Sequence, residues 1–188
     1  MSNKRERILS SAEALIASKG FHGMSMQQVA KHANVATGTI YRYFADKETM
    51  LRSAHVERLS EVATAIVAGV DASQPCYEQF SKLWRNTMHY LRANPDSLCY
   101  RMQYEASPLF NREEEQQMDE RYFKTVMEFF ECGRAQGVFR DIPAQLLGFL
   151  ALENLMLLTQ KCTKGCIELD DELYQQLLDA SWNAILKR

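Results

Sequence analysis

The chain has 188 residues, of which 46% are hydrophobic and 24% charged, with eight glycines and four prolines. This composition is typical of an ordinary globular protein with one large or two small domains. No segment reaches the run of about 18 apolar residues that spans a bilayer, and residues 1–20 lack the unbroken apolar centre of a secretory signal. We therefore expect a cytoplasmic protein with no membrane partner, in which the five cysteines stay reduced.

The net charge of −2 conceals an asymmetry along the chain. Residues 1–47 carry seven basic and three acidic side chains, whereas the remaining residues carry fifteen basic and twenty-one acidic ones. A basic N-terminal segment followed by an acidic remainder indicates that the N-terminal segment is the part that meets a polyanion.

Helical spacing of apolar residues recurs from one end of the chain to the other, without a convincing strand. The predicted fold is therefore all-α, with about nine helices. The first predicted helix has an apolar stripe over residues 8–16 and ends at Gly20, which can adopt a left-handed conformation. Ser25 and Gln28 have the spacing of a capping box, which predicts a short helix over residues 26–32.

A tight turn is predicted at Asn34, because asparagine tolerates the left-handed region of backbone conformation. A third short helix is expected to contain Thr39 and Phe44. Asp46 is then expected to cap a fourth helix that runs to about Val70.

Five longer helices are predicted in the remainder, separated by proline, glycine and asparagine breaks. Their expected bounds are about 75–93, 95–106, 112–136, 143–163 and 171–185. The run at 143–160 is apolar nearly all round, which predicts a helix buried on both sides. Together with the apolar stripe of the last helix, it is more than one small body needs to bury, so a homodimer is expected. The candidates for its interface are Leu147, Leu150, Leu173, Leu177 and Trp182.

Two short helices joined by a tight turn in a basic segment are typical of a helix-turn-helix, whose second helix enters the major groove. Its leading end has to present small or polar side chains to base edges, and its far end needs donors for phosphates. The residues that meet these demands are Thr37, Gly38, Thr39, Tyr41, Arg42, Tyr43 and Lys47. Ser25 and Gln27, with the amides of the first helix, are placed to meet a phosphate. For Tyr41 and Tyr43 the alternative is core packing, which is usual for aromatic residues of small domains.

The segment from Phe21 to Leu51 resembles the DNA-binding head of the TetR family of repressors. The matches that carry this resemblance are Val29-Ala30, Gly38-Thr39-Ile40-Tyr41, Tyr43-Phe44 and Lys47-Glu48. The resemblance implies a helix-turn-helix DNA-binding domain over residues 1–46 and an effector-binding and dimerisation domain over residues 47–188. It also implies a homodimer joined by the last two helices of each chain. Such a dimer binds double-stranded operator DNA and releases it when a small-molecule effector occupies the body.

Roles at particular positions follow from the same resemblance. Met26 and Gln27 occupy positions where the family touches phosphate and base, and Lys47 occupies the position of a lysine that clamps the DNA backbone. Ala36 stands where the family usually has a Ser or Thr that caps the recognition helix. We therefore expect Thr37 to take over as the cap, or the helix to fray.

Aromatic and methionine side chains of the body are candidates for an effector cavity, although for most of them the plainer interpretation is an ordinary core. The candidates are Trp84, Met88, Tyr104, Phe123, Met127 and Asn154. Glu153 and Asn154 interrupt an otherwise apolar helix, and a buried polar pair needs partners at a dimer seam or on a ligand. An acidic body rich in aromatic residues favours an apolar or a cationic effector.

Two alternatives to effector-controlled repression stay open. A DNA-binding regulator can work without a small-molecule inducer, or it can respond to oxidation of Cys162 and Cys166, which lie one helical turn apart. An enzyme is not expected, because the sequence has no nucleophile and base pair, phosphate loop or metal-ligating cluster. Neither a cofactor nor a metal is predicted.

Overall fold

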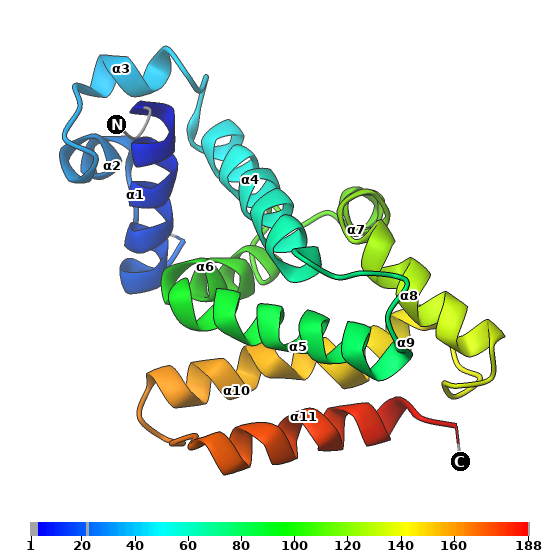
Figure 1. Cartoon of the computed structure of the whole chain (residues 1–188). Helices are drawn as coiled ribbons and strands as arrows, with labels where there is room; N and C mark the ends of the chain where they lie inside the picture. The colour runs from blue at the N-terminus through cyan, green and yellow to red at the C-terminus, as the bar shows by residue number, and fades with distance from the viewer. Residues whose placement is uncertain (1–3, 22, 188) are drawn as a thin grey trace. The chain divides into compact units, whose positions relative to one another are not determined.

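The computed structural model describes residues 4–21 and 23–187, which form helices joined by short connections (Figure 1). In chain order the elements are α1 (Lys4–Lys19), α2 (Met26–His32), α3 (Thr37–Tyr41), α4 (Lys47–Val67), α5 (Cys76–Ala93), α6 (Pro95–Glu105), α7 (Arg112–Tyr122), α8 (Lys124–Ala135), α9 (Ala144–Gly148), the π-helical segment η1 (Phe149–Glu153), α10 (Asn154–Thr163) and α11 (Asp171–Ile185). Within the described residues no strand forms, and extended pairing is limited to an isolated bridge between Phe139 and Leu186. The predicted all-α fold is confirmed.

The chain forms two compact units. The N-terminal unit combines the described residues up to 60 with residues 94–117, and the C-terminal unit combines residues 61–93 with residues 118–187. The N-terminal unit therefore holds α1, α2, α3 and α6 together with the first part of α4. The predicted division at residue 46 concerns function, and it stays a prediction.

The turn and cap signals of the first helices form as predicted. The Ser25 N–H donates to Gln28 Oε1 at 2.9 Å, and the Gln28 N–H donates to Ser25 Oγ at 3.3 Å, which completes the capping box of α2. Gly20 has a φ of 75° where α1 ends, and Asn34 has a φ of 52° between α2 and α3. Asn34 is the residue type outside glycine that bears this conformation at least cost.

Helix α3 is shorter than predicted, because it ends at Tyr41 and does not reach Phe44. Ala36 caps it without a side-chain hydrogen bond, so Thr37 is simply the first helical residue. Phe44 lies beyond the helix, where its N–H donates to the carbonyl of Ile40 at 2.9 Å, and its ring is buried in the core of the N-terminal unit. Ile40 and Phe44 together anchor the inner side of this segment.

Charged groups connect α1, α4 and α6 inside the N-terminal unit. Arg58 of α4 donates to Glu6 at 2.8 Å and to Glu13 at 2.5 Å, both on α1. Ser97 of α6 donates to the second oxygen of Glu13 at 3.2 Å. The hydrogen bond from Arg58 holds the pKa of Glu6 below its usual value. Because Glu13 is nearly fully buried, removing Arg58 would leave a charge with little access to solvent.

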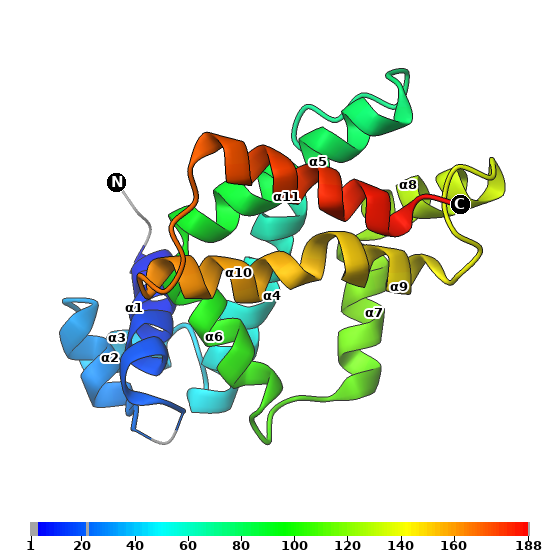
Figure 2. The same cartoon turned by 90° about the horizontal axis from the view of Figure 1, so that it is seen from below.

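In the C-terminal unit, α11 packs on η1 and α5 and runs along the continuous helix that contains η1 (Figures 1 and 2). Trp182 of α11 is central to this packing, because its ring lies 5.3 Å from Tyr77, 5.1 Å from Phe80 and 5.6 Å from Phe139, measured between centroids. Phe139 packs on Gly133, where an added Cβ would overlap its ring. The chain after α11 is held by backbone hydrogen bonds to residues 138–140.

Two of the predicted longer helices differ from expectation. The helix predicted over 112–136 is divided at Phe123, whose φ of −99° and ψ of 15° depart from helical values. The helix predicted from residue 143 is continuous but contains η1, in which the hydrogen bonds span one residue more than in an α-helix. The expectation that this helix is buried on both sides is wrong for the single chain. Its exposed apolar side chains are Leu146, Phe149, Leu150 and Leu157.

Candidate nucleic-acid interface

The second helix of the predicted helix-turn-helix has a buried side and an exposed polar side. Ile40 of α3 is fully buried in one apolar cluster with residues of α1 and α2. This side chain therefore fixes α3 on the core of the N-terminal unit. Tyr41, the last residue of α3, is 54% exposed, and in the turn that follows it Arg42 is exposed and Tyr43 is 43% exposed. Exposed tyrosine hydroxyls and a guanidinium are donors that reach phosphates and base edges. The alternative of core packing does not hold for either tyrosine.

Gly38 lies near the start of α3 in open space. A Cβ added there would meet no atom within 4 Å, and the backbone is not in the left-handed region that favours glycine. The fold of the chain therefore does not require a glycine at this position. Thr37 and Thr39, its neighbours in the helix, are half-buried.

The first helix of the pair has residues of two kinds. Ser25 and Gln27 are exposed, although the Ser25 hydroxyl is already used to cap α2. Met26, to which the resemblance gave a contact with DNA, is only 9% exposed and belongs to the core of the N-terminal unit. Its side chain belongs to the same buried apolar cluster as Val29, so it has little surface to offer to a ligand.

Two basic residues of the N-terminal unit, Lys47 and Arg5, have partners within the chain. The Lys47 Nζ donates to the backbone carbonyls of Phe21 and Met24, each at 2.8 Å. Arg5 forms an ion pair with Glu57 of α4, and its guanidinium lies 5.5 Å from the centroid of the Phe44 ring. Sequence reasoning missed these contacts, because the partners of Lys47 are two backbone carbonyls, which any residue supplies, and the partner of Arg5 is a glutamate far along the chain.

Comparison with known proteins identifies the family. A family model of bacterial regulatory proteins of the tetR family matches residues 8–54, and a model of a tetracyclin repressor-like C-terminal domain matches residues 75–186. An HTH-type transcriptional regulator from Haemophilus influenzae is 30% identical to the chain over 184 residues, which cover 97% of this chain and 95% of that protein. The chain belongs to the TetR family of transcriptional regulators.

Solved structures agree with this assignment over the whole chain. A putative transcriptional regulator of the TetR family from Vibrio parahaemolyticus has 34% sequence identity and a TM-score of 0.85, covering 99% of this chain and 100% of that one. FadR from Bacillus subtilis in complex with stearoyl-CoA has the same fold, with 19% identity, a TM-score of 0.76 and coverage of 95% of this chain and 98% of that one. TetR-family regulators bind operator DNA, usually as dimers. Among the described helices of this TetR-family regulator, none is long and apolar enough to cross a membrane.

The six residues predicted to bind an effector lie in different environments, and the prediction stays a prediction. Trp84 and Met88 are fully buried in the C-terminal unit, where the Trp84 Nε1 donates to Ser181 Oγ at 3.1 Å. Tyr104 belongs to the N-terminal unit. The remaining three are Phe123 and Met127, which are half-buried, and Asn154, which is exposed and donates to the Leu150 carbonyl. Glu153 is also exposed in the single chain, so burial of this polar pair at a dimer seam or by a ligand stays a prediction.

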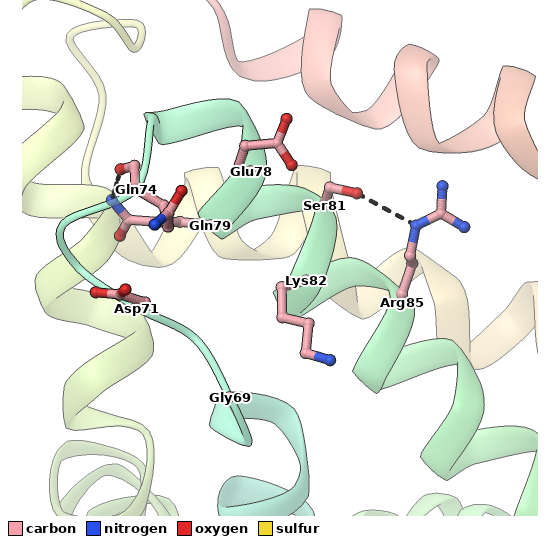
Figure 3. Close-up of a pocket in the computed structure, with 8 residues that line it drawn as sticks. All are labelled: Gly69, Asp71, Gln74, Glu78, Gln79, Ser81, Lys82 and Arg85. Carbon is pink, nitrogen blue, oxygen red and sulfur yellow. Dashed lines mark hydrogen bonds between the residues drawn. The ribbon is translucent and has the colours of Figure 1, made fainter.

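A polar hollow of about 330 Å³ lies between the α4–α5 connection and α5 of this TetR-family regulator (Figure 3). Its lining residues are Gly69, Asp71, Gln74, Glu78, Gln79, Ser81, Lys82 and Arg85. None of the six predicted effector residues lines it, and its mixed charges do not match the apolar cavity that the sequence predicted.

A buried polar cluster in the N-terminal unit was not predicted. The His55 ring of α4 stacks on Tyr104 of α6 with centroids 3.9 Å apart, and its Nε2 lies 2.8 Å from Glu115 Oε2 of α7. Burial alone would raise the pKa of Glu115, but the hydrogen bond and the electrostatic attraction of His55 outweigh it and lower the pKa. His55 and Glu115 are 60 residues apart, so no local pattern marks them as a pair.

The predicted interface residues lie in different environments. Leu150 and Leu173 are exposed, whereas Leu177 and Trp182 are half-buried. Leu147 is fully buried in the core of its own chain and has no surface for a partner. On the helix from α9 to α10 the prediction omitted three exposed apolar residues, Leu146, Phe149 and Leu157.

The two cysteines considered for redox sensing lie at the end of α10. Cys162 is half-buried in the last turn, and Cys166 is exposed just beyond it. The Cys166 N–H donates to the Lys161 carbonyl at 2.9 Å, which closes the turn after the helix. Both sulfurs are free thiols. Control by oxidation stays a prediction.

Proposed function

We propose that this TetR-family regulator is a repressor that reads its operator with the exposed side of α3. The observation that carries the proposal is a recognition helix that is anchored by the buried Ile40 and ends in three exposed residues, Tyr41 in its last turn and Arg42 and Tyr43 just beyond it. The residues proposed to contact DNA are Ser25, Gln27, Thr37, Gly38, Thr39, Tyr41, Arg42 and Tyr43. Tyrosine, arginine and the α2 residues suit phosphates, and the small residues at the start of α3 suit close approach to base edges.

The test of this function is binding to the DNA immediately upstream of its own gene, measured by fluorescence anisotropy against a duplex of unrelated sequence. We expect saturable binding that is at least about 1,000-fold tighter than binding to the unrelated duplex. Equal affinity for both duplexes at every salt concentration, extended to fragments around the neighbouring genes, would contradict sequence-specific repression.

The protein is also proposed to act as a homodimer that uses the exposed apolar side of the helix from α9 to α10 together with α11. Leu157 is 58% exposed and Phe149 is 55% exposed, and Leu150 and Leu173 extend the same kind of surface. Apolar side chains this exposed are typical of a surface that a partner covers. Two recognition helices have to lie about 34 Å apart to enter successive major grooves, which a single chain cannot provide.

A small-molecule effector, apolar or cationic, is proposed to release the DNA. The support is the aromatic, acidic C-terminal unit and two regulators that share the fold: FadR, in complex with stearoyl-CoA, which has a long apolar acyl chain, and a putative regulator from Saccharomonospora viridis, in complex with the cation choline. Of the predicted effector residues, we propose that Phe123 and Met127 contact the effector, because both are half-buried and keep some accessible surface. Trp84 and Met88 are fully buried in the core and have no accessible surface.

Displacement of a fluorescent operator duplex tests this effector proposal. Fatty alcohols of increasing chain length form the apolar series, and quaternary ammonium compounds such as choline form the cationic series. An effector is expected to weaken operator binding by about 5- to 150-fold, the usual range of coupling between two sites. If operator binding is intact and neither series weakens it, both proposed effector classes are wrong.

A further inference from the structure

Lys47, the first residue of α4, is bonded to the connection between α1 and α2. Its Nζ lies 2.8 Å from the carbonyl oxygens of both Phe21 and Met24, and 5.7 Å from the centroid of the Phe21 ring. An ammonium group has three N–H donors, and the two carbonyls use two of them. Lys47, the residue that the resemblance predicted to bind the DNA backbone, therefore has hydrogen-bond partners within the N-terminal unit.

One of these bonds acts on the start of α2. The Met24 carbonyl and the Ser25 N–H belong to the same planar peptide group. Lys47 binds the oxygen of this group, and the Ser25 N–H donates to Gln28 Oε1 at 2.9 Å. The peptide is therefore held at both edges, which fixes the plane from which α2 begins.

The helix that carries Lys47 is itself tied to α1. Arg58 of α4 bonds Glu6 and Glu13, so the orientation of α4 relative to α1 is set by charged contacts within the N-terminal unit. Through its bond to the Met24 carbonyl, Lys47 connects α4 to the start of α2, the first helix of the helix-turn-helix. The Val35 N–H then donates to the Ala30 carbonyl at 3.0 Å, in the turn that joins α2 to α3.

We propose that Lys47 is a positioning residue of the helix-turn-helix. It fixes the orientation of α2 by bonding the Met24–Ser25 peptide, and it does not bind a phosphate. The proposal rests on DNA binding by the head. It predicts that Lys47 contributes to affinity but not to the number of counterions released when DNA binds.

The test compares Lys47→Met with Arg42→Met in the full chain, because each variant removes one positive charge. Binding is measured as a function of salt on a duplex of unrelated sequence as well as on the upstream fragment. Loss of one phosphate contact lowers the slope of log affinity against log salt by about 0.9 per protomer. We expect this change for Arg42→Met. For Lys47→Met we expect an unchanged slope, an affinity reduced by about tenfold, and faster hydrogen exchange of the Ser25 amide.

The unrelated duplex keeps this test separate from the proposal of an operator, since its salt slope reports phosphate contacts whether or not an operator has been found. A Lys47→Met slope that falls as much as that of Arg42→Met, with unchanged exchange at Ser25, would overturn the positioning role.

A double-mutant cycle gives a second measurement if Lys47→Met lowers the stability of the head. Gln28→Leu removes the bond at the other edge of the Met24–Ser25 peptide. If Lys47 acts through that peptide, the affinity losses of Lys47→Met and Gln28→Leu are not additive. Additive losses would show that Lys47 contacts DNA independently.

Discussion

At the scale of single residues, Gly38 is a position where a substitution is expected to affect DNA binding but not folding. Because its backbone is ordinary and its surroundings are open, Gly38→Ala is expected to keep the fold and to raise stability by up to about 1 kcal/mol through helix propensity. The added methyl group lies on the exposed side of α3, so operator affinity is expected to fall at least about tenfold. Thermal unfolding and anisotropy on the same preparation check both parts; a variant that binds normally would show that DNA does not approach this position.

Tyr41 gives a second residue-scale prediction. Its side chain is more than half exposed, so Tyr41→Ala is expected to change the free energy of unfolding by less than about 0.5 kcal/mol. Sequence-selective operator binding is expected to be abolished, because each protomer loses a donor to the DNA. Anisotropy titration with the upstream fragment measures the loss, and circular dichroism confirms the fold. Normal binding would remove α3 from its assigned role.

The sequence predicts local interactions of single residues better than distant ones. The capping box of Ser25 and Gln28 and the left-handed Asn34 follow from short-range spacing, and both form. The pattern that marks Met26 as a contact residue cannot report burial, which depends on how α2 packs on α1. The partners of Lys47 are backbone carbonyls, which no side-chain pattern marks.

At the scale of helices, the Arg58 bonds connect acid stability to the contact of α4 with α1. The pKa of Glu6 is lowered from 4.5 by the Arg58 hydrogen bond. Because this pKa is lowered, the ionised Glu6 side chain stabilises the folded state fully above pH 4.5. The stabilisation is lost as the pH falls below 4.5, through the pKa of the folded state.

Glu6→Gln is therefore expected to lower the melting temperature at pH 7 by about 1–3 °C, as befits a partly exposed ion pair. The difference from the parent protein is expected to close as the pH falls below 4.5, through the lowered pKa of Glu6 in the folded state. Melting curves across this pH range provide the measurement, with Glu168→Gln on the exposed α10–α11 connection as the control. A difference that stays constant at all pH values would show that the charge of Glu6 is not the cause.

Periodicity and caps predict the existence and type of the helices, but not where long ones bend. The division at Phe123 has no proline or glycine to mark it, and the Met127 N–H still bonds to the Phe123 carbonyl, as it would in a continuous helix. The π-helical segment over 149–153 also lies within a run of good helix formers. Both features depend on how the helices pack, which a one-dimensional pattern does not contain.

At the scale of the whole molecule, the exposed apolar surface from α9 to α10 predicts the assembly. Leu157→Glu places a charge on a surface that we expect a second copy to cover. The variant is expected to sediment as a folded monomer and to lose operator affinity by at least about 100-fold, because only one recognition helix can then bind. Thr125→Glu on the exposed side of α8 is the matched control. A Leu157→Glu dimer of normal stability would place the interface elsewhere.

Effector residues are the part of the molecule that the sequence predicts least. Trp84, Met88 and Phe123 belong to types that serve a core and a binding cavity equally well, and only packing distinguishes the two uses. The structure uses Trp84 and Met88 as core. It also builds the His55–Glu115 pair from helices that the sequence gives no reason to join.

The packing of Phe139 on Gly133 has a consequence for the history of the family. An aromatic ring at position 139 can lie against α8 only if position 133 has no Cβ, and the same ring contacts Trp182 near the end of the chain. Among relatives with this C-terminal domain, the residues at these three positions are expected to covary. A lineage that gains a side chain at 133 should also have replaced the ring at 139, and should hold its last helix by other contacts.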